Sequence, residues 1–257
     1  MNTRLVSRGK FPGAAPAAGF TLVEMAIGIL VIALLLGSIL VPLSTQVEQR
    51  KISETQKALD EIREALLGYA LTQGYLPCPA VSATTGTEGS RAAGVCNSRM
   101  GFLPWADLGS AKLDAWGRIY LYSVTPAFSN ASPATRFTLG TTRDITIQTR
   151  DSAGTLVNLS VGNNIPAIIL SVGRNGYWGT IDNGAIVGDK PNVPPDPDNP
   201  DEDANRNGNG DGRNFITRTL TENTGAAGGE FDDIVVWLSP NVLFNRMVAA
   251  GQLPRSN

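Results

Sequence analysis

The longest apolar stretch runs from Phe20 to Val41 and contains a single charged residue, Glu24. As a helix rising about 1.5 Å per residue, it would extend roughly 33 Å, enough to cross a bilayer. A core helix of a soluble domain usually keeps a polar face, which this stretch lacks. The pattern therefore predicts a transmembrane helix over residues 20–41, with a buried core helix as the alternative.

A polar segment with helical periodicity follows. Between Gln46 and Leu71, positions suited to one buried face recur at spacings of three and four: Ile52, Thr55, Leu59, Ile62, Leu66 and Tyr69. Pro42 need not end the helix, because neighbours can absorb a proline kink, whereas Gly74 is a suitable stop. We expect residues 42–73 to continue the helix in amphipathic form and pack on a globular part. A solvated coiled coil is the alternative.

Residues 74–257 have the pattern of one globular domain. Short β-branched and aromatic runs bounded by Gly, Pro or Asp predict strands at 118–124, 136–139, 145–149, 155–161, 166–172 and 234–238. Ser239 and Pro240 suit the start of a last helix over 241–250, and Gly251 suits its end. The expected fold class is α+β: a long N-terminal helix, half transmembrane and half amphipathic, packed on a small antiparallel sheet, with a short C-terminal helix.

Composition narrows the possible chemistry. The chain has 21 Lys and Arg, 23 Asp and Glu, a net charge of −2 and no histidine. Without histidine there is no Ser-His-Asp triad, Cys-His dyad or His-ligated zinc. Residues 1–19 hold Arg4, Arg8 and Lys10 and no acid, and this is the one basic cluster. We therefore expect no nucleic-acid partner.

The junction between this basic leader and the apolar stretch carries a specific motif, Gly19-Phe20-Thr21-Leu22-Val23-Glu24. A secretory signal peptide has its small-residue cleavage site after the apolar run, whereas here the small residues precede it. The motif resembles the processing site of the type IV pilin and type II secretion pseudopilin superfamily. That resemblance implies that a prepilin peptidase removes residues 1–19 by cutting after Gly19, and that the new N-terminal Phe20 is methylated.

The resemblance also implies a role for Glu24 in assembly. In the superfamily this acid pairs with the N-terminal amine of a neighbouring subunit, and the apolar helices stack in the filament core. A carboxylate inside an apolar segment needs such a partner. The alternatives are that Glu24 reaches the interface or pairs with the amine of its own chain.

Three further strings extend the resemblance into the globular part. Asp114–Tyr120, Ser171–Gly176 and Phe231–Ile234 follow one another in the order of similar strings in the major pseudopilin of type II secretion. The chain departs from that pattern at Ala115, where the family has proline, and by a longer 180–230 region and the last helix.

The two cysteines, Cys78 and Cys96, are predicted to form a disulfide. If the basic leader stays in the cytoplasm, the globular part lies in an oxidising compartment, where disulfides persist. Closing a loop of this size stabilises the fold by about 3 kcal/mol in the chain-entropy model. The expected location is the bacterial inner membrane, crossed once with the globular domain in the periplasm, and then an envelope-spanning or surface filament.

An Asp/Asn/Gly-rich loop over residues 190–214 is a candidate calcium site. Asp203, Asn205 and Asn207 occupy the first, third and fifth positions of an EF-hand-type loop, and Asp211 falls at the ninth. The twelfth position is Asn214 instead of the bidentate Glu, so we predict a non-EF-hand Ca²⁺ site. A solvated linker without an ion is the alternative. The pseudopilin resemblance independently implies calcium in the C-terminal loop region, and no organic cofactor is expected.

The resemblance thus implies a structural subunit of a type II secretion pseudopilus. The expected partners are the prepilin peptidase, copies of this chain, other pilins or pseudopilins, and the inner-membrane assembly platform. A minor pilin of a type IV pilus, serving adhesion, motility or DNA uptake, is the alternative. A membrane-anchored enzyme is a remote third, since Asp232-Asp233 and Asp196/Asp198 are acid pairs but no nucleophile motif accompanies them.

Overall fold

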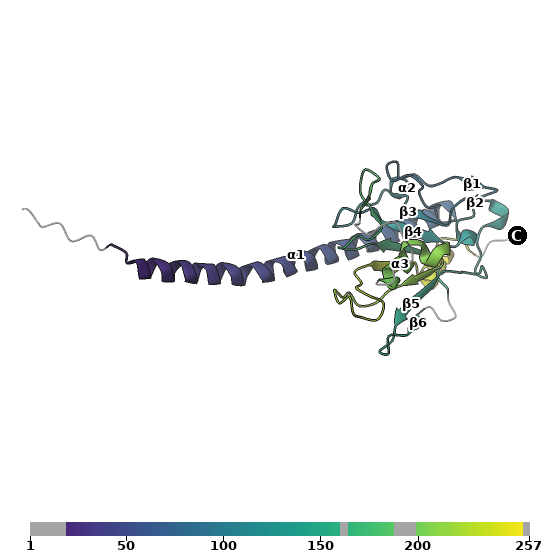
Figure 1. Ribbon diagram of the computed structural model, residues 1–257. Helices are drawn as coiled ribbons and strands as arrows, with labels where there is room; N and C mark the ends of the chain where they lie inside the picture. The colour runs from purple at the N-terminus through teal and green to yellow at the C-terminus, as the bar shows by residue number, and fades with distance from the viewer. Residues whose placement is uncertain (1–18, 160–163, 188–198, 254–257) are drawn as a thin grey trace, which may run out of the picture. The chain divides into compact units, whose positions relative to one another are not determined.

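A computed structural model describes residues 19–159, 164–187 and 199–253 (Figure 1). The chain divides into two compact units, residues 1–48 and 49–257, and the helix α1 (Leu22–Gln73) has residues in both. Of the predicted leader, residues 1–19, all but Gly19 lie outside the described residues.

The helix α1 begins directly after the proposed processing site. The backbone N–H of Glu24 donates to Thr21 Oγ1 at 3.1 Å, and the backbone N–H of Thr21 donates to the Glu24 carboxylate at 3.2 Å. This reciprocal pair is a capping box, which satisfies N–H groups that the first helical turn leaves free. Glu24 therefore has a local structural role in the chain as it stands.

The predicted transmembrane helix is wrong, and with it the predicted fold and the single-pass location in the inner membrane. A span needs about 20 consecutive, predominantly apolar residues in a helix. Over the part of the chain that the structure describes, no helix combines enough length with enough apolar character to cross a membrane.

The second unit is α+β and is built around a four-stranded antiparallel sheet in the order β11-β7-β4-β3. Its strands are β3 (Met100–Phe102), β4 (Leu121–Val124), β7 (Ala167–Ser171) and β11 (Ile234–Trp237). The end of α1 and the helix α4 (Pro240–Ala249) pack on one face through buried Leu59, Ile62, Leu66, Leu243 and Met247.

A smaller three-stranded sheet covers the other face. It contains β5 (Thr146–Arg150), β6 (Leu156–Asn158) and β10 (Asn214–Ile216), with β10 parallel and β6 antiparallel to β5. Its buried Ile147 and Phe215 pack with Ile168 and Leu170 of β7. Because side chains of β7 alternate between faces, this strand contributes to both cores.

The remaining elements are short. They are the strands β1 (Arg91–Ala92), β2 (Val95–Cys96), β8 (Gly179–Thr180) and β9 (Ile186–Val187), the helices α2 (Trp105–Leu108) and α3 (Pro200–Asn207), the 3₁₀ turns η1 (Pro126–Phe128) and η2 (Pro133–Thr135), and the π turn η3 (Gly208–Gly212). The run 136–139 forms no strand. Instead, Phe137 is buried and stacks on Phe128, with ring centroids 4.7 Å apart.

The structure contains the disulfide between Cys78 and Cys96, whose Cα atoms lie 5.5 Å apart. Glu88 makes further contacts within the loop that this disulfide closes. It accepts a hydrogen bond from the backbone N–H of Cys78 at 2.9 Å and pairs with Arg91 at 2.6 Å. The loop is therefore held both covalently and by a partly buried ion pair.

Candidate metal centre

Three acidic side chains meet where α3 lies against the residues that precede β11. Glu202 comes from the first turn of α3, and Asp232 and Asp233 lie directly before the strand. A carboxylate oxygen from each lies within 4.8 Å of the others. Glu202 and Asp233 are each 4% exposed, and Asp232 is half-buried. We call these three residues the acidic cluster.

Burial makes the charged form of this cluster costly. It raises the pKa of Asp232 to about 8, with a further contribution from the negative charge of Glu202. Burial likewise raises the pKa of Glu202, and it raises that of Asp233 well above its usual range, with Glu202 again adding to the effect. Near neutral pH the cluster must therefore hold protons or a cation, because neighbouring buried carboxylates cannot all ionise uncompensated.

Neutral donors hold the carboxylates in place without removing this excess of negative charge. Asn175 Nδ2 and Asn199 Nδ2 donate to Glu202 Oε2 at 2.9 and 2.6 Å. The backbone N–H of Asn175 donates to Asp232 Oδ2 at 2.8 Å, and Asn205 Nδ2 donates to Asp233 Oδ2 at 2.9 Å. The arrangement fixes the oxygens in position and leaves the charge to be balanced by something else.

Two oxygens next to the cluster remain without a donor. Asn199 Oδ1 and Asp232 Oδ1 are buried, and no described residue donates a hydrogen bond to either. Buried acceptors normally have a partner, so each marks a place where one is missing. Carboxylate and amide oxygens are the ligands that Ca²⁺ prefers, and no nitrogen or sulfur ligand for a softer metal lies in the cluster. The residues present therefore fit a hard divalent cation.

The three strings that resemble the major pseudopilin contact one another in turn, and the second and third meet at the acidic cluster. Ser171 Oγ donates to Asp114 Oδ2 at 2.7 Å, which joins the first string to the second. Gly173 has a φ of +63° and lies so close to Asp232 that a side chain there would collide with it. Glycine is required at that turn both for its conformation and for its lack of a side chain.

Each of the four residues predicted to bind calcium has a partner within the protein. Asp203 pairs with Arg206 at 3.2 Å, and the group of acids close enough to share a cation contains neither Asp203 nor Asp211. Asn205 is buried and bonds the backbone of Ile216 as well as Asp233. Residues 200–207 form a helix, so the side chains at alternate positions, such as Asp203, Asn205 and Asn207, point in different directions.

The other two predicted ligands serve the turn that follows α3. Asn207 Oδ1 accepts from the N–H of Gly210 at 2.7 Å, and Asp211 Oδ1 accepts from the N–H of Arg213 at 3.1 Å. Residues 190–198 of the predicted loop lie outside the described residues. Glu202, Asn175 and Asn199 were missed as candidates. The signal that could have found them is the pairing of the 171–176 and 231–234 strings, not the acidic loop alone.

Of the predicted processing and assembly residues, Gly19 and Phe20 precede α1, and the Phe20 side chain is 81% exposed. From Leu22 to Leu35, the large apolar side chains of α1 are 45–91% exposed. We call residues 22–35 the exposed apolar segment.

Comparison with known proteins identifies no family for this chain. No protein-family model matches it, and neither do the curated proteins or the solved structures. The likeness to pilins and pseudopilins therefore rests on the motifs described above.

Proposed function

We propose that this chain is a prepilin-like structural subunit, cut after Gly19 and assembled into a type II secretion pseudopilus. The observation that carries the proposal is the exposed apolar segment. Its side chains include Leu22 at 91%, Leu34 at 68% and Val23 at 67% exposed, and its one charged residue, Glu24, is too little to form a polar outer face. A contiguous apolar surface of this kind marks an interaction site.

Packing against the same segment of other copies would bury this surface. Helices with apolar residues on every side are stable when neighbours surround them, and a helical stack supplies neighbours all round. The helix begins at Leu22, close behind the proposed cut, so cleavage would leave it intact with a short N-terminus.

Glu24 has a defined place in this proposal. In the intact chain its carboxylate accepts from the backbone N–H and the hydroxyl of Thr21, both at 3.2 Å. Cleavage after Gly19 would create a positively charged amine at Phe20, one residue before Thr21. An apolar filament core strengthens the attraction between this amine and the Glu24 of a neighbouring copy.

The acidic cluster favours a pseudopilin over the alternative, a minor pilin of a type IV pilus. It joins two of the strings that resemble the major pseudopilin, and its oxygens suit the calcium which that resemblance implies in the C-terminal loop region.

The experiment is to shear host cells at native expression, blot the sheared and cell-retained fractions, and sequence the N-terminus of the protein in each. A chain that begins at Phe20 and stays with the cells supports the pseudopilus. A chain that begins at Phe20 in sheared surface filaments supports the pilus alternative.

A Glu24→Gln variant is the matched test of assembly, because it keeps the size and the hydrogen-bonding side chain but removes the charge. We expect it to be cut at Phe20 and to fail to assemble. A wild-type chain that keeps Met1 while the prepilin peptidase is active contradicts both filament functions.

A further inference from the structure

The strand β11 has one open side, beyond the bridge that Phe231, before the strand, makes with Thr221. It lies at the end of the four-stranded sheet, paired with β7 alone among the described strands. The backbone N–H of Leu238 donates to Ala167 at 2.9 Å, and antiparallel pairs alternate between bonded and non-bonded positions. The N–H and C=O groups of Val235 and Trp237 therefore point to the open side.

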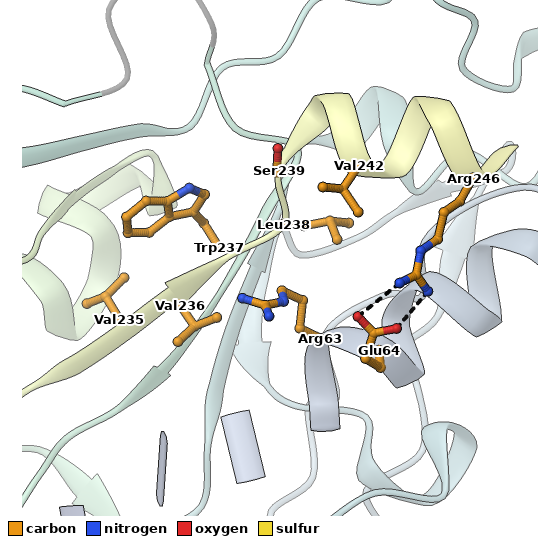
Figure 2. A pocket seen from close by; sticks show the side chains of 9 residues that line it. All are labelled: Arg63, Glu64, Val235, Val236, Trp237, Leu238, Ser239, Val242 and Arg246. Atoms are coloured by element: carbon orange, nitrogen blue, oxygen red, sulfur yellow. Dashed lines mark hydrogen bonds and ion pairs between the residues drawn. The ribbon is translucent and has the colours of Figure 1, made fainter. Parts of the chain in front are cut away.

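A mostly apolar groove of about 630 Å³, lined also by the charged residues Arg63, Glu64 and Arg246, runs beside this edge. Figure 2 shows Val235, Val236 and Trp237 along the strand, with Val242 on the adjoining helix α4. Arg246 of α4 pairs with Glu64 of α1 at 2.6 Å and forms part of the rim. Free backbone groups beside an apolar groove are the features by which an added strand is bound.

The strand β6 has the complementary features. It lies at the end of the three-stranded sheet, and the N–H of Leu159 donates to Ile147 at 2.8 Å. The same alternation points the N–H and C=O groups of Leu156 and Asn158 to its open side. Leu156 and Val157 are 37% and 38% exposed. Proteins usually block such an exposed apolar edge, because it otherwise pairs with another chain.

We propose that β6 of one copy of this chain adds to the open side of β11 of the next copy. The free backbone groups occur at every second residue on both strands, so an antiparallel pair places Leu156 opposite Trp237 and Asn158 opposite Val235. In Figure 1 the β5–β6 hairpin extends away from the rest of its unit, and all three residues of β6 are exposed.

This pairing joins two different surfaces and is therefore head-to-tail. A head-to-tail contact that does not close into a ring produces a helical filament. The inference rests on the proposed filament function, to which it adds a contact between globular units that is separate from the packing of the exposed apolar segments.

Cysteine crosslinking of the full chain tests the pairing. Val157 and Val236 would lie opposite each other at a non-hydrogen-bonded position, with Cα atoms about 4.5 Å apart, within disulfide range. We expect a mixture of Val157→Cys and Val236→Cys chains to form a crosslinked dimer on oxidation, and neither variant to do so alone. Val81→Cys, at a side chain 75% exposed, is the control partner for Val236→Cys. Crosslinking no greater than in this control overturns the pairing.

A proline provides the second test. Leu156→Pro removes an N–H that points to the open side and keeps the bonds between β5 and β6, whereas Leu156→Ser keeps the N–H. In the Val157→Cys chain we expect the proline to reduce crosslinking about tenfold or more, and the serine much less. Equal crosslinking in both variants contradicts the proposed strand pairing.

Filament yield and the N-terminal residue are measured in the same samples, so that the two proposals can fail separately. Filaments that begin at Phe20 without the 157–236 crosslink overturn the strand pairing and leave the filament function standing. The crosslink in a chain that keeps Met1 and forms no filaments supports the pairing and contradicts the function.

Discussion

The exposed apolar segment leaves apolar side chains uncovered by the rest of the described chain, whereas the acidic cluster buries carboxyl groups. Leu30 is 60% exposed although its side chain is apolar. Asp233 is 4% exposed although its charged form requires water or a partner. The first region lacks a large apolar surface to pack on, and the second lacks a small positive charge. The two regions therefore differ in what would stabilise them: an apolar partner for the first, and protons or a cation for the second.

The largest expected difference in stability is between a substitution in the exposed apolar segment and one in the packed end of the same helix, α1. Leu66→Ala should lower the free energy of unfolding of residues 49–257 by about 2–5 kcal/mol, because Leu66 is fully buried against the sheet. Leu30→Ala should change it by less than about 0.5 kcal/mol. Urea unfolding followed by tryptophan fluorescence reports on this unit, since all four tryptophans lie in it.

The contrast between the two parts of α1 fails if Leu30→Ala destabilises that unit as much as Leu66→Ala does. The Leu30 side chain would then have a packing role in the isolated chain, and the exposed apolar segment would no longer be evidence for a partner.

A smaller effect is expected from calcium at the acidic cluster. With a dissociation constant of about 10⁻⁴ to 10⁻³ M, 10 mM Ca²⁺ should stabilise the fold by about 1.4–2.7 kcal/mol. Glu202→Gln should abolish this gain. Asp203→Asn is the matched control, because Asp203 is the next residue but pairs with Arg206 outside the cluster.

Urea unfolding with calcium or with chelator measures both variants. No calcium effect on the wild-type chain would contradict the metal centre. Loss of the effect in Asp203→Asn instead of Glu202→Gln would move the site back to the residues predicted from the sequence.

With chelator present, the free energy of unfolding should depend on pH, because protons then take the place of a cation at the acidic cluster. The pKa of Asp232 rises from 3.8 to about 8 on folding, so the folded chain keeps a proton that the unfolded chain releases. The free energy of unfolding should therefore fall as the pH rises from about 4 to about 8, with the full stabilisation present below pH 4. Burial shifts the pKa values of Glu202 and Asp233 in the same direction.

Asp232→Asn should reduce the change in the free energy of unfolding with pH. Saturating calcium should reduce that change further in the wild-type chain. The measurement is the urea midpoint between pH 5 and pH 8. A wild-type midpoint that rises with pH over this range would contradict uncompensated carboxyl groups in the cluster.

Local patterns in the sequence predicted the elements that depend on short-range spacing. The stripe through Leu59, Ile62 and Leu66 is buried, and α1 ends at Gln73, before Gly74 with its φ of +79°. The last helix was expected at 241–250 and occupies Pro240–Ala249, although Ser239 makes no side-chain capping bond. Periodicity is a property of neighbouring residues, so one sequence suffices to read it.

The same reasoning gave wrong predictions where the local sequence pattern does not match the structure around it. The length and apolarity of residues 20–41 predicted a membrane span that the described structure does not contain. The run 136–139 has the composition of a strand, yet Phe137 is used to fill the core beside Phe128. Propensity is a weak guide when packing of a large side chain decides the conformation.

What the sequence alone determined is the helix stripe, most of the strands of the main sheet and the Cys78–Cys96 disulfide. What only the tertiary structure decided is which acids meet. The N–H of Asp232 donates to Glu202 at 2.7 Å although 30 residues separate them, and Asp203, next to Glu202, points elsewhere. The reason is that the position of a residue on a helix follows from its neighbours, whereas the meeting of α3 with the residues before β11 depends on the packing of the whole unit.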